Sequence, residues 1–231
     1  MIRYILTDIE GTTTSTSFVY ETLFPYFKRH IAAFLSAPVL MPQLEHHLQA
    51  VRQTVSEEGG AILSTSEMAD QLIVWTDADR KHPALKAMQG ILWRGAYRNN
   101  AISGHIYPDV PSALERWKKA GIQMGVYSSG SVEAQQLLFT HSDFGDLTPF
   151  FLHYFDTGVG NKREEASYRA IQKIIDLPAG EILFLSDVEA ELDAAKAAGM
   201  QTVQLVRPGT TAAERHDTVA DFAQINLTFQ L

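Results

Sequence analysis

Short apolar runs that end abruptly in polar residues recur along this chain, most regularly after residue 104. Between them lie segments in which apolar residues return every three or four positions, the period of an amphipathic helix. The runs predict strands at residues 4–7, 123–127, 182–185 and 201–206, and the periodic segments predict helices at 110–120, 131–139, 162–175 and 189–198. Because strands alternate with helices of this length, the pattern predicts βαβ units and a parallel sheet.

The stretch that follows the first predicted strand has a different pattern. It shows helical periodicity without a convincing strand, and it predicts helices at residues 20–35, 42–55, 64–76 and 83–97. We therefore expect an α/β fold with a Rossmann-like parallel sheet, in which residues 1–15 and 101–231 form the core and residues 16–100 an all-helical insert. An insert directly after the first strand would overhang the carboxyl edge of the sheet, where a lid belongs.

Composition narrows the classes of protein without identifying one. The chain has 231 residues, of which 45% are hydrophobic and 20% charged, as is usual for a globular protein. The chain has no cysteine, so it can form neither disulfides nor a reactive thiolate. No apolar stretch approaches the roughly 20 residues that span a bilayer. A net charge of -8 argues against nucleic acid and anionic membrane as partners. Because nothing at Met1 resembles a signal peptide, we expect a cytoplasmic protein.

Two carboxylates follow the first predicted strand. Asp8 and Glu10 stand on alternate positions before Gly11, and hydroxyl residues come next. In an extended segment this spacing points both acids to the same side. Gly11 lets the backbone turn sharply or approach a ligand closely. Because open α/β sheets bind their ligands at the carboxyl ends of the strands, the two acids can address one reacting atom there.

Further polar residues are predicted to reach the same edge of the sheet. Ser128 and Ser129 follow the second predicted strand, Lys162 stands at the start of a helical segment, and Asp187 follows another strand. This set suits phosphoryl transfer, which depends on positioning and on electrostatic stabilisation. Asp8 can act as a nucleophile, and with Asp187 it offers the hard oxygen ligands that Mg²⁺ prefers. Ser128 can donate to a phosphoryl oxygen, and Lys162 offsets the carboxylates.

These residues resemble the four-motif pattern of the haloacid dehalogenase superfamily of phosphatases, along the whole chain. Within that superfamily, the chain resembles the enolase-phosphatases of methionine salvage. The segment 8–13, DIEGTT, has glutamate where most relatives have a second aspartate, and the segment 126–135, VYSSGSVEAQ, matches that family closely. Supporting matches are HYFDT at 153–157, Lys162, FLSD at 184–187 and VRPG at 206–209.

The resemblance implies a core of the haloacid dehalogenase type with a helical cap, one Mg²⁺ per chain, and a phosphorylated diketone as substrate. That substrate, 2,3-diketo-5-methylthiopentyl-1-phosphate, would be enolised and then dephosphorylated to the acireductone. The implied roles are Asp8 as nucleophile and metal ligand, Glu10 as acid/base residue and metal ligand, Ser128, Ser129 and Lys162 as substrate contacts, Lys162 also as a catalytic residue, and Asp187 as the remaining metal ligand. We also expect a monomer whose insert carries the substrate selectivity.

Other interpretations stay open on the sequence alone. A phosphatase of the same fold could act on another small phosphorylated metabolite. A response-regulator receiver also uses Asp, Ser or Thr, and Lys at strand ends, but it has no reason to carry this insert or the acid at Glu10. We expect Glu189, Glu191 and Asp193 to lie mostly on a solvated helix face, with Glu191 a candidate for a role beside the metal. We expect Arg207 to be structural.

Overall fold

The computed structural model describes residues 1–37, 41–61 and 63–229. The chain divides into two compact units, one formed by Met1–Thr16 with Ser103–Leu231 and the other by Ser17–Ile102. The first unit is built on a parallel sheet, and the second is built from helices. Each unit has a hydrophobic core of its own.

The sheet of the first unit has six strands, which are β1 (Tyr4–Thr7), β2 (Gln123–Tyr127), β3 (His153–Phe155), β4 (Ile182–Ser186), β5 (Gln201–Leu205) and β6 (Asp217–Val219). Their order is β3-β2-β1-β4-β5-β6, and every pairing is parallel. Four strands occupy the predicted runs, so the expected α/β fold with a parallel sheet is confirmed. The pattern does not predict the edge strands β3 and β6, because three residues are too few to show a period of two.

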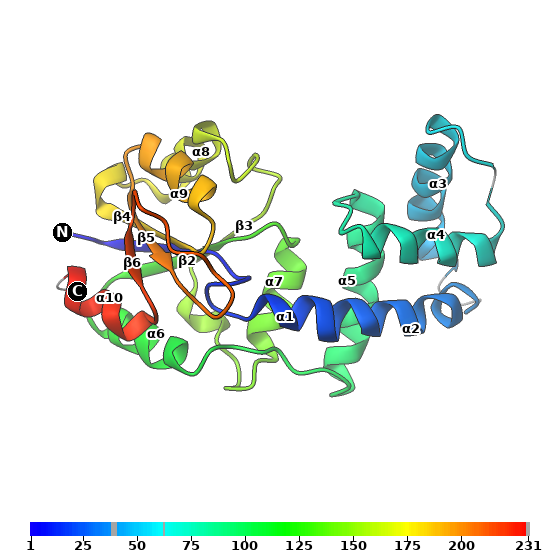
Figure 1. Ribbon diagram of the computed structural model, residues 1–231. Coiled ribbons are helices and arrows are strands. Elements are labelled where there is room, and N and C mark those ends of the chain that lie inside the picture. Colours follow the sequence, from blue (N-terminus) through cyan, green and yellow to red (C-terminus); the bar gives the residue numbers. More distant parts are fainter. Residues whose placement is uncertain (38–40, 62, 230–231) are drawn as a thin grey trace. The chain divides into compact units, whose positions relative to one another are not determined.

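The helices of this unit are α6 (Asp109–Lys119), α7 (Val132–Thr140), α8 (Glu165–Ile175), α9 (Glu189–Ala197) and α10 (Phe222–Phe229), with short 3-10 helices at Thr148–Phe150 and Ala179–Glu181. Helices α8 and α9 lie on one side of the sheet, and α6 and α10 lie on the other (Figure 1). The prediction that a helix begins at Lys162 is wrong, since α8 begins at Glu165. Asn161 closes a turn first, because its side-chain oxygen accepts a hydrogen bond from the Arg163 amide at 3.0 Å.

Strand β1 lies inside the sheet and aligns the polar strand ends. Thr7 pairs with Val126 of β2 on one side and with Leu185 of β4 on the other. The chain segments that follow Thr7, Val126 and Leu185 therefore leave the sheet side by side at its carboxyl edge. From β1 the chain continues to β2 and β3 on one side of the sheet order, and later to β4, β5 and β6 on the other. In open α/β sheets, the carboxyl edge at such a change of side is the usual place of the ligand.

The second unit consists of α1 (Thr16–Phe18), which starts at its boundary, the π-helix η1 (Val19–Leu23), α2 (Phe24–Leu35), α3 (Met41–Glu57), α4 (Thr65–Asp77) and α5 (Pro83–Arg98). Fully buried side chains from four of these helices meet in its core, among them Phe27, Leu48, Leu72 and Met88. Helix α4 begins with a capping box, in which Ser64 and Glu67 satisfy each other's backbone amides. This unit therefore has both the core and the helix caps that local stability needs.

The chain leaves the first unit and returns to it at neighbouring points. The Thr14 hydroxyl lies 2.9 Å from Nδ1 of His105, and the Ser15 amide donates to the same nitrogen at 3.2 Å. These contacts join the segment that precedes the helical unit to the segment that follows it.

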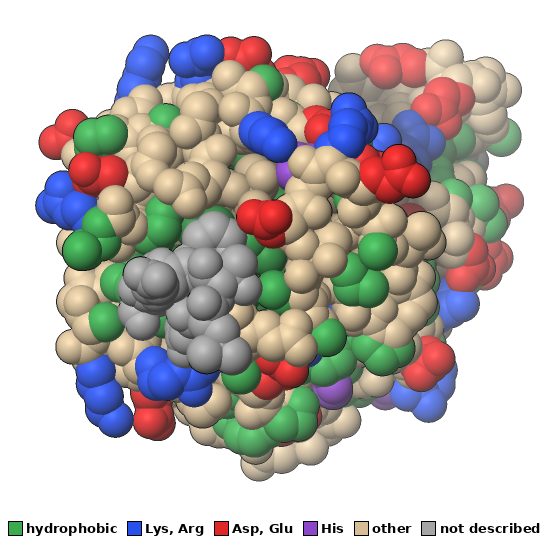
Figure 2. All heavy atoms as spheres, turned by 60° about the vertical axis from the view of Figure 1, so that its left-hand side comes forward, with side chains coloured by type: hydrophobic (Ala, Val, Ile, Leu, Met, Phe, Trp, Pro, Cys, Tyr) green, Lys and Arg blue, Asp and Glu red, His purple; other side chains and the backbone are tan. Residues whose placement is uncertain are grey.

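The surface of the sheet unit mixes charges of both signs. On the face drawn in Figure 2, Lys and Arg side chains lie among Asp and Glu side chains instead of forming one large patch. A large patch of one sign is what steers a polyanion toward a protein. None of the described helices is long and apolar enough to cross a membrane.

Candidate active site

Asp8 is the first residue beyond β1, and its backbone is fixed by hydrogen bonds. Its amide donates to the Leu185 carbonyl at 2.8 Å, which extends the pairing with β4 by one residue. Its carbonyl accepts hydrogen bonds from the hydroxyls of Thr7 at 2.9 Å and Thr13 at 3.4 Å. The Asp8 side chain is only 7% exposed. The Asp8 backbone is therefore held in one place at the sheet edge, which positions the side chain for an in-line reaction.

Lys162 contacts Asp8 directly. Its Nζ lies 2.6 Å from Asp8 Oδ1 and 2.7 Å from Glu191 Oε2, and all three side chains are buried. Burial alone would lower the pKa of Lys162, but the two carboxylates outweigh burial and raise this pKa. The Tyr168 hydroxyl donates to the Lys162 carbonyl at 2.8 Å and fixes the turn before α8. Lys162 is therefore a permanently charged, well-placed cation beside Asp8.

Glu191 is buried, which corrects the expectation that this part of α9 is mostly a solvated face. Its side chain is 10% exposed, and Oε2 also accepts a hydrogen bond from the Ser186 hydroxyl at 3.0 Å. Burial and the nearby Asp8 charge raise the pKa of Glu191. One lysine between two carboxylates leaves the site with an excess of negative charge. Glu191 therefore binds Lys162 as a second carboxylate beside Asp8.

Asp187 follows β4 and carries a buried oxygen without a hydrogen bond. No described residue donates to its Oδ1. The backbone of Gly11 lies so close that a Cβ there would overlap the Asp187 carboxylate. Burial and the Asp8 charge raise the pKa of Asp187 to about 6. Leaving a buried acceptor without a donor costs free energy, so this carboxylate is suited to a cation.

The donor set at this edge fits Mg²⁺. That ion accepts one or two protein carboxylates and completes its octahedron with waters and phosphate oxygens. Within residues 1–37, 41–61 and 63–229, no three His, Cys, Asp or Glu side chains gather as a metal cluster. Glu10 lies in the same loop, half-buried, and its charge adds to the raised pKa of Asp187. Its place as a third ligand stays a prediction.

Ser128 lies at the end of the adjacent strand, β2, in a loop tied to β3. Its amide donates to the Phe155 carbonyl at 3.1 Å, and its hydroxyl accepts from the Gly130 amide at 3.2 Å. Ser128 is buried and Ser129 is half-buried. Gln135 of α7 fixes this loop, because its side-chain nitrogen donates to the carbonyls of Gly130 at 2.9 Å and Phe155 at 2.8 Å.

The sheet edge thus brings most of the predicted residues together. Asp8 and Lys162 are in contact, Asp187 lies against the loop at Gly11, and the Ser128 loop follows the neighbouring strand. Two further residues support them: Glu191, which the sequence suggested only for a role beside the metal and which contacts Lys162, and Gln135, which the sequence did not single out and which fixes the Ser128 loop. The signal that could identify both is a polar residue at an inward position of an amphipathic helix.

Comparison with known proteins places this arrangement in a family. A family model described as haloacid dehalogenase-like hydrolase matches residues 2–199, a span that includes all the predicted site residues. The fold also matches the crystal structure of the UTR4 protein of Saccharomyces cerevisiae, with a TM-score of 0.79 and 31% identity over 97% of this chain and 100% of that one. CbbY of Rhodobacter sphaeroides, solved in complex with phosphate, shares the fold at 18% identity and a TM-score of 0.62.

Curated relatives are closer still in sequence. Enolase-phosphatase E1 of a Picosynechococcus species is 51% identical over 97% of this chain and 98% of its own length. The protein of the same name from Pseudomonas aeruginosa is 49% identical, with 97% of this chain and 98% of its own covered. Identity at this level over nearly the full length of both proteins shows that the chain belongs to the enolase-phosphatase family of haloacid dehalogenase-like hydrolases.

Proposed function

We propose that this protein enolises 2,3-diketo-5-methylthiopentyl-1-phosphate and then removes its phosphate, which gives the acireductone of methionine salvage. The observation that carries the proposal is the buried contact of 2.6 Å between Lys162 and Asp8, together with the Asp187 carboxylate, whose buried Oδ1 has no hydrogen-bond donor. Relatives named enolase-phosphatase, at 49% and 51% identity, support the choice of reaction.

In the dephosphorylation step, Asp8 is the nucleophile. Lys162 occupies Oδ1, which leaves Oδ2 to attack phosphorus. The bond between phosphorus and the substrate oxygen breaks, and this oxygen takes a proton from Glu10. Glu10 then removes a proton from water, which attacks the aspartyl-phosphate and releases phosphate and free Asp8. Lys162 stays protonated throughout and limits the charge that accumulates around the phosphoryl oxygens.

Asp8 and Asp187 would hold the Mg²⁺, with Glu10 as the third ligand of the proposal. When bound, the ion would supply electrostatic stabilisation to the phosphoryl and enolate oxygens. The unsatisfied Oδ1 of Asp187 and the raised pKa of that carboxyl are what favour a cation there.

Ser128 and Ser129 would contact the substrate together with Lys162. The sheet unit contains every residue to which we assign a catalytic, metal-binding or substrate-binding role. Because one unit of a single chain holds all of them, we propose that the protein works as a monomer. We propose further that it works in the cytoplasm and that the helical unit acts as a cap that selects the methylthio tail.

The direct test follows enol absorbance and free phosphate together, with the diketo phosphate against a panel of ordinary phosphomonoesters. We expect both signals with the diketo phosphate, weak phosphate release from the panel, and loss of phosphate release in excess chelator. Turnover of another phosphomonoester in place of the diketo compound would assign the protein to a different substrate of the same fold.

Asp8→Asn separates the two steps in this assay. Asn keeps an oxygen and the shape of the side chain but loses its charge and nucleophilicity, so phosphate release should stop. Enolisation needs no nucleophile at phosphorus, so some enol absorbance should remain and the enol-phosphate should accumulate. If neither signal appears while metal and substrate still bind, Asp8 is needed for both steps.

A further inference from the structure

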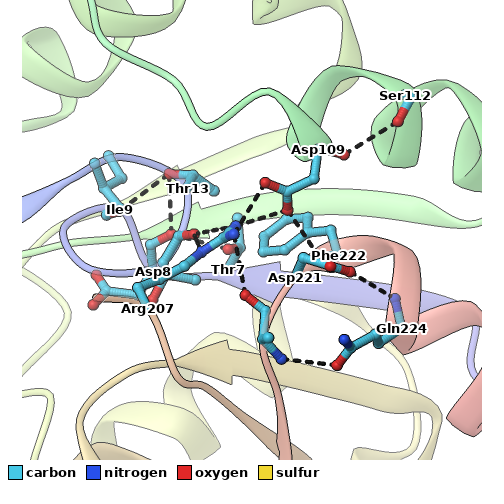
Figure 3. A network of polar contacts seen from close by, with 12 residues as sticks. Thr7, Asp8, Ile9, Thr13, Asp109, Ser112, Arg207, Asp221, Phe222 and Gln224 are labelled. Carbon is cyan, nitrogen blue, oxygen red and sulfur yellow. Dashed lines mark hydrogen bonds and ion pairs between the residues drawn. The ribbon is translucent and has the colours of Figure 1, made fainter. Parts of the chain in front are cut away.

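Arg207 is a buried arginine whose hydrogen-bonding capacity is fully used. It follows β5, and only 6% of its surface is exposed. A guanidinium group has five N–H donors. Here Nε donates to the Thr12 carbonyl, Nη1 to Asp109 and the Ala220 carbonyl, and Nη2 to Thr12 and Asp109, at 2.8–3.2 Å. Figure 3 shows this network from close by, together with the loop that carries Asp8 and Thr13.

The arginine is held in a single orientation. Its two terminal nitrogens form a fork on the Asp109 carboxylate, at 3.0 Å to Oδ1 and 2.8 Å to Oδ2. The same carboxylate accepts the Phe222 amide at 2.8 Å. The guanidinium carbon lies 4.1 Å from the ring centre of Tyr107 and 5.6 Å from that of Phe222. Fork pairing and stacking of this kind are specific to arginine, and lysine cannot reproduce them.

What this rigid group holds is the loop that carries the nucleophile. Thr12 is four residues from Asp8, in a tight turn where the amides of Thr12, Thr13 and Thr14 all donate to the Ile9 carbonyl. Two of the five arginine bonds reach the Thr12 carbonyl, at 3.2 and 3.1 Å. The Thr12 hydroxyl itself is buried without a hydrogen bond, so the contacts of this residue with the rest of the described sheet unit run through its backbone carbonyl.

The same turn brings Gly11 against the Asp187 carboxylate. A shift of Thr12 would move its neighbour Gly11, and with it the spacing between the Asp8 loop and Asp187. That spacing is narrow, because a Cβ at position 11 would already overlap the Asp187 carboxylate. A displacement of about 1 Å in a catalytic group can cost about 10²-fold in rate.

We propose that Arg207 is a positioning residue for phosphoryl transfer. It fixes the Thr12 carbonyl and thereby sets the geometry of Asp8 and Glu10 relative to Asp187. The inference rests on the proposed function and assigns Arg207 a role beyond the structural one expected from the sequence.

The test compares Arg207→Lys with the unaltered enzyme on the diketo phosphate, with kcat, KM, the Mg²⁺ concentration for half-maximal rate and the melting temperature all measured. Lysine keeps the charge but loses the fork. We expect kcat to fall by about 10–10²-fold, in line with a small misplacement, with KM nearly unchanged and more Mg²⁺ needed for half-maximal rate. In Arg207→Ala, millimolar guanidinium should restore part of kcat, whereas the same concentration of sodium chloride should not.

His216→Gln is the matched control, because His216 is also a buried polar residue that joins elements of the sheet unit. Its ring nitrogens contact Thr202 at 2.9 Å and Asp193 at 3.1 Å. We expect this variant to melt at a lower temperature with kcat unchanged. If Arg207→Lys melts lower and keeps the kcat of the unaltered enzyme, Arg207 is only structural and the inference is wrong.

Two further outcomes, a variant that does not fold and a failure of the proposed function, can be told apart from a failure of the inference. Should Arg207→Lys not fold, Asp109→Asn keeps the arginine but weakens its fork and the hydrogen bond that Asp109 accepts from the Phe222 amide. A folded Asp109→Asn with unchanged kcat and Mg²⁺ dependence overturns the inference. If the unaltered enzyme does not turn over the diketo phosphate, the proposed function fails, and the Arg207 comparison is made on whichever phosphomonoester it hydrolyses.

Discussion

The backbone of Gly11 lies directly against the carboxylate of Asp187, with no room for a side chain between them. Gly11 also has a positive φ of 72°, which favours glycine for a second reason. The pair therefore brings the loop after β1 against the residue that follows the end of β4, with no space for a Cβ at position 11. This contact makes Gly11 the most restrictive position in the nucleophile loop.

Gly11→Ala should therefore reduce activity far more than an ordinary surface change. The new Cβ must displace either the loop or the Asp187 carboxylate, and a shift of about 1 Å can lower kcat by about 10²-fold. Steady-state kinetics with saturating Mg²⁺ measures the effect. Gly121→Ala is the control, since Gly121 has a similar φ of 76° and open space around it. Equal effects of the two variants on kcat would mean that backbone strain, and not the contact with Asp187, limits position 11.

Lys162→Met tests the charge balance of the buried cluster. Removing the lysine leaves Asp8 and Glu191 buried without their cation, which typically costs about 3–5 kcal/mol in the free energy of unfolding. The loss should be smaller at pH 5 than at pH 8, because a carboxyl group whose pKa is raised in the folded state takes up a proton there. Urea unfolding at both pH values measures it.

The double variant Lys162→Met, Glu191→Gln distinguishes charge balance from catalysis. It removes one cation and one carboxylate, so part of the lost stability should return. Activity should stay low, because Asp8 still lacks its partner. Recovery of activity along with stability would show that Lys162 serves only to neutralise Glu191.

Glu10→Gln should slow breakdown of the phosphoenzyme. Gln cannot deprotonate the water that attacks the aspartyl-phosphate, and loss of this general base should slow breakdown by about 10²–10⁴-fold, more than formation is slowed. Rapid-quench experiments should then detect phosphate bound to the protein early in the reaction. Asn at position 8 in the same background should abolish the bound phosphate. Single-turnover and steady-state rates equal to those of the unaltered enzyme would leave Glu10 without a chemical role.

His153 should make stability depend on pH between 5 and 8. Burial lowers the pKa of His153 below its usual 6.5, and its Nδ1 lies 2.9 Å from the Tyr4 hydroxyl. A base whose pKa is depressed by folding contributes stability that is complete above about pH 6.5 and is lost as the pH falls. His153→Gln should therefore show a smaller loss of unfolding free energy between pH 8 and pH 5. An equal loss in both proteins would point to other groups.

Much of the fold could be predicted because its signals are local. The buried runs at β1, β2, β4 and β5 show their apolar character within a few residues. Strand β3 could not be predicted from the sequence. Its three residues, His153 to Phe155, include a half-buried His and Tyr whose placement depends on the neighbouring strand. Lys162 lies outside α8 because Asn161 forms a turn before the helix. Hydrophobic periodicity does not reveal a turn of this kind.

The site was predictable where a residue ends a strand and unpredictable where its partner is distant. Asp8 and Asp187 follow apolar runs, so their common edge could be inferred from the strands alone. Arg207 contacts Thr12 and Asp109, which are far away in the sequence, and only the fold shows that a single side chain joins them. Glu191 could be suggested from the sequence only as a candidate beside the metal, because its contact with Lys162 depends on how α9 packs against the sheet.

The contact of Thr14 and Ser15 with His105 has a consequence for how the chain folds. Tyr4 of β1 must find Gln123 of β2 across the whole helical unit, and such distant pairings slow folding. A helical unit with its own core can form first and bring its two ends to the same place, where His105 joins them. The search then resembles the closure of a short loop, and each halving of effective loop length saves about 0.6 kcal/mol of entropy cost. A different helical insert that has its own core could thus stand between Ser15 and His105 without slowing the assembly of the sheet.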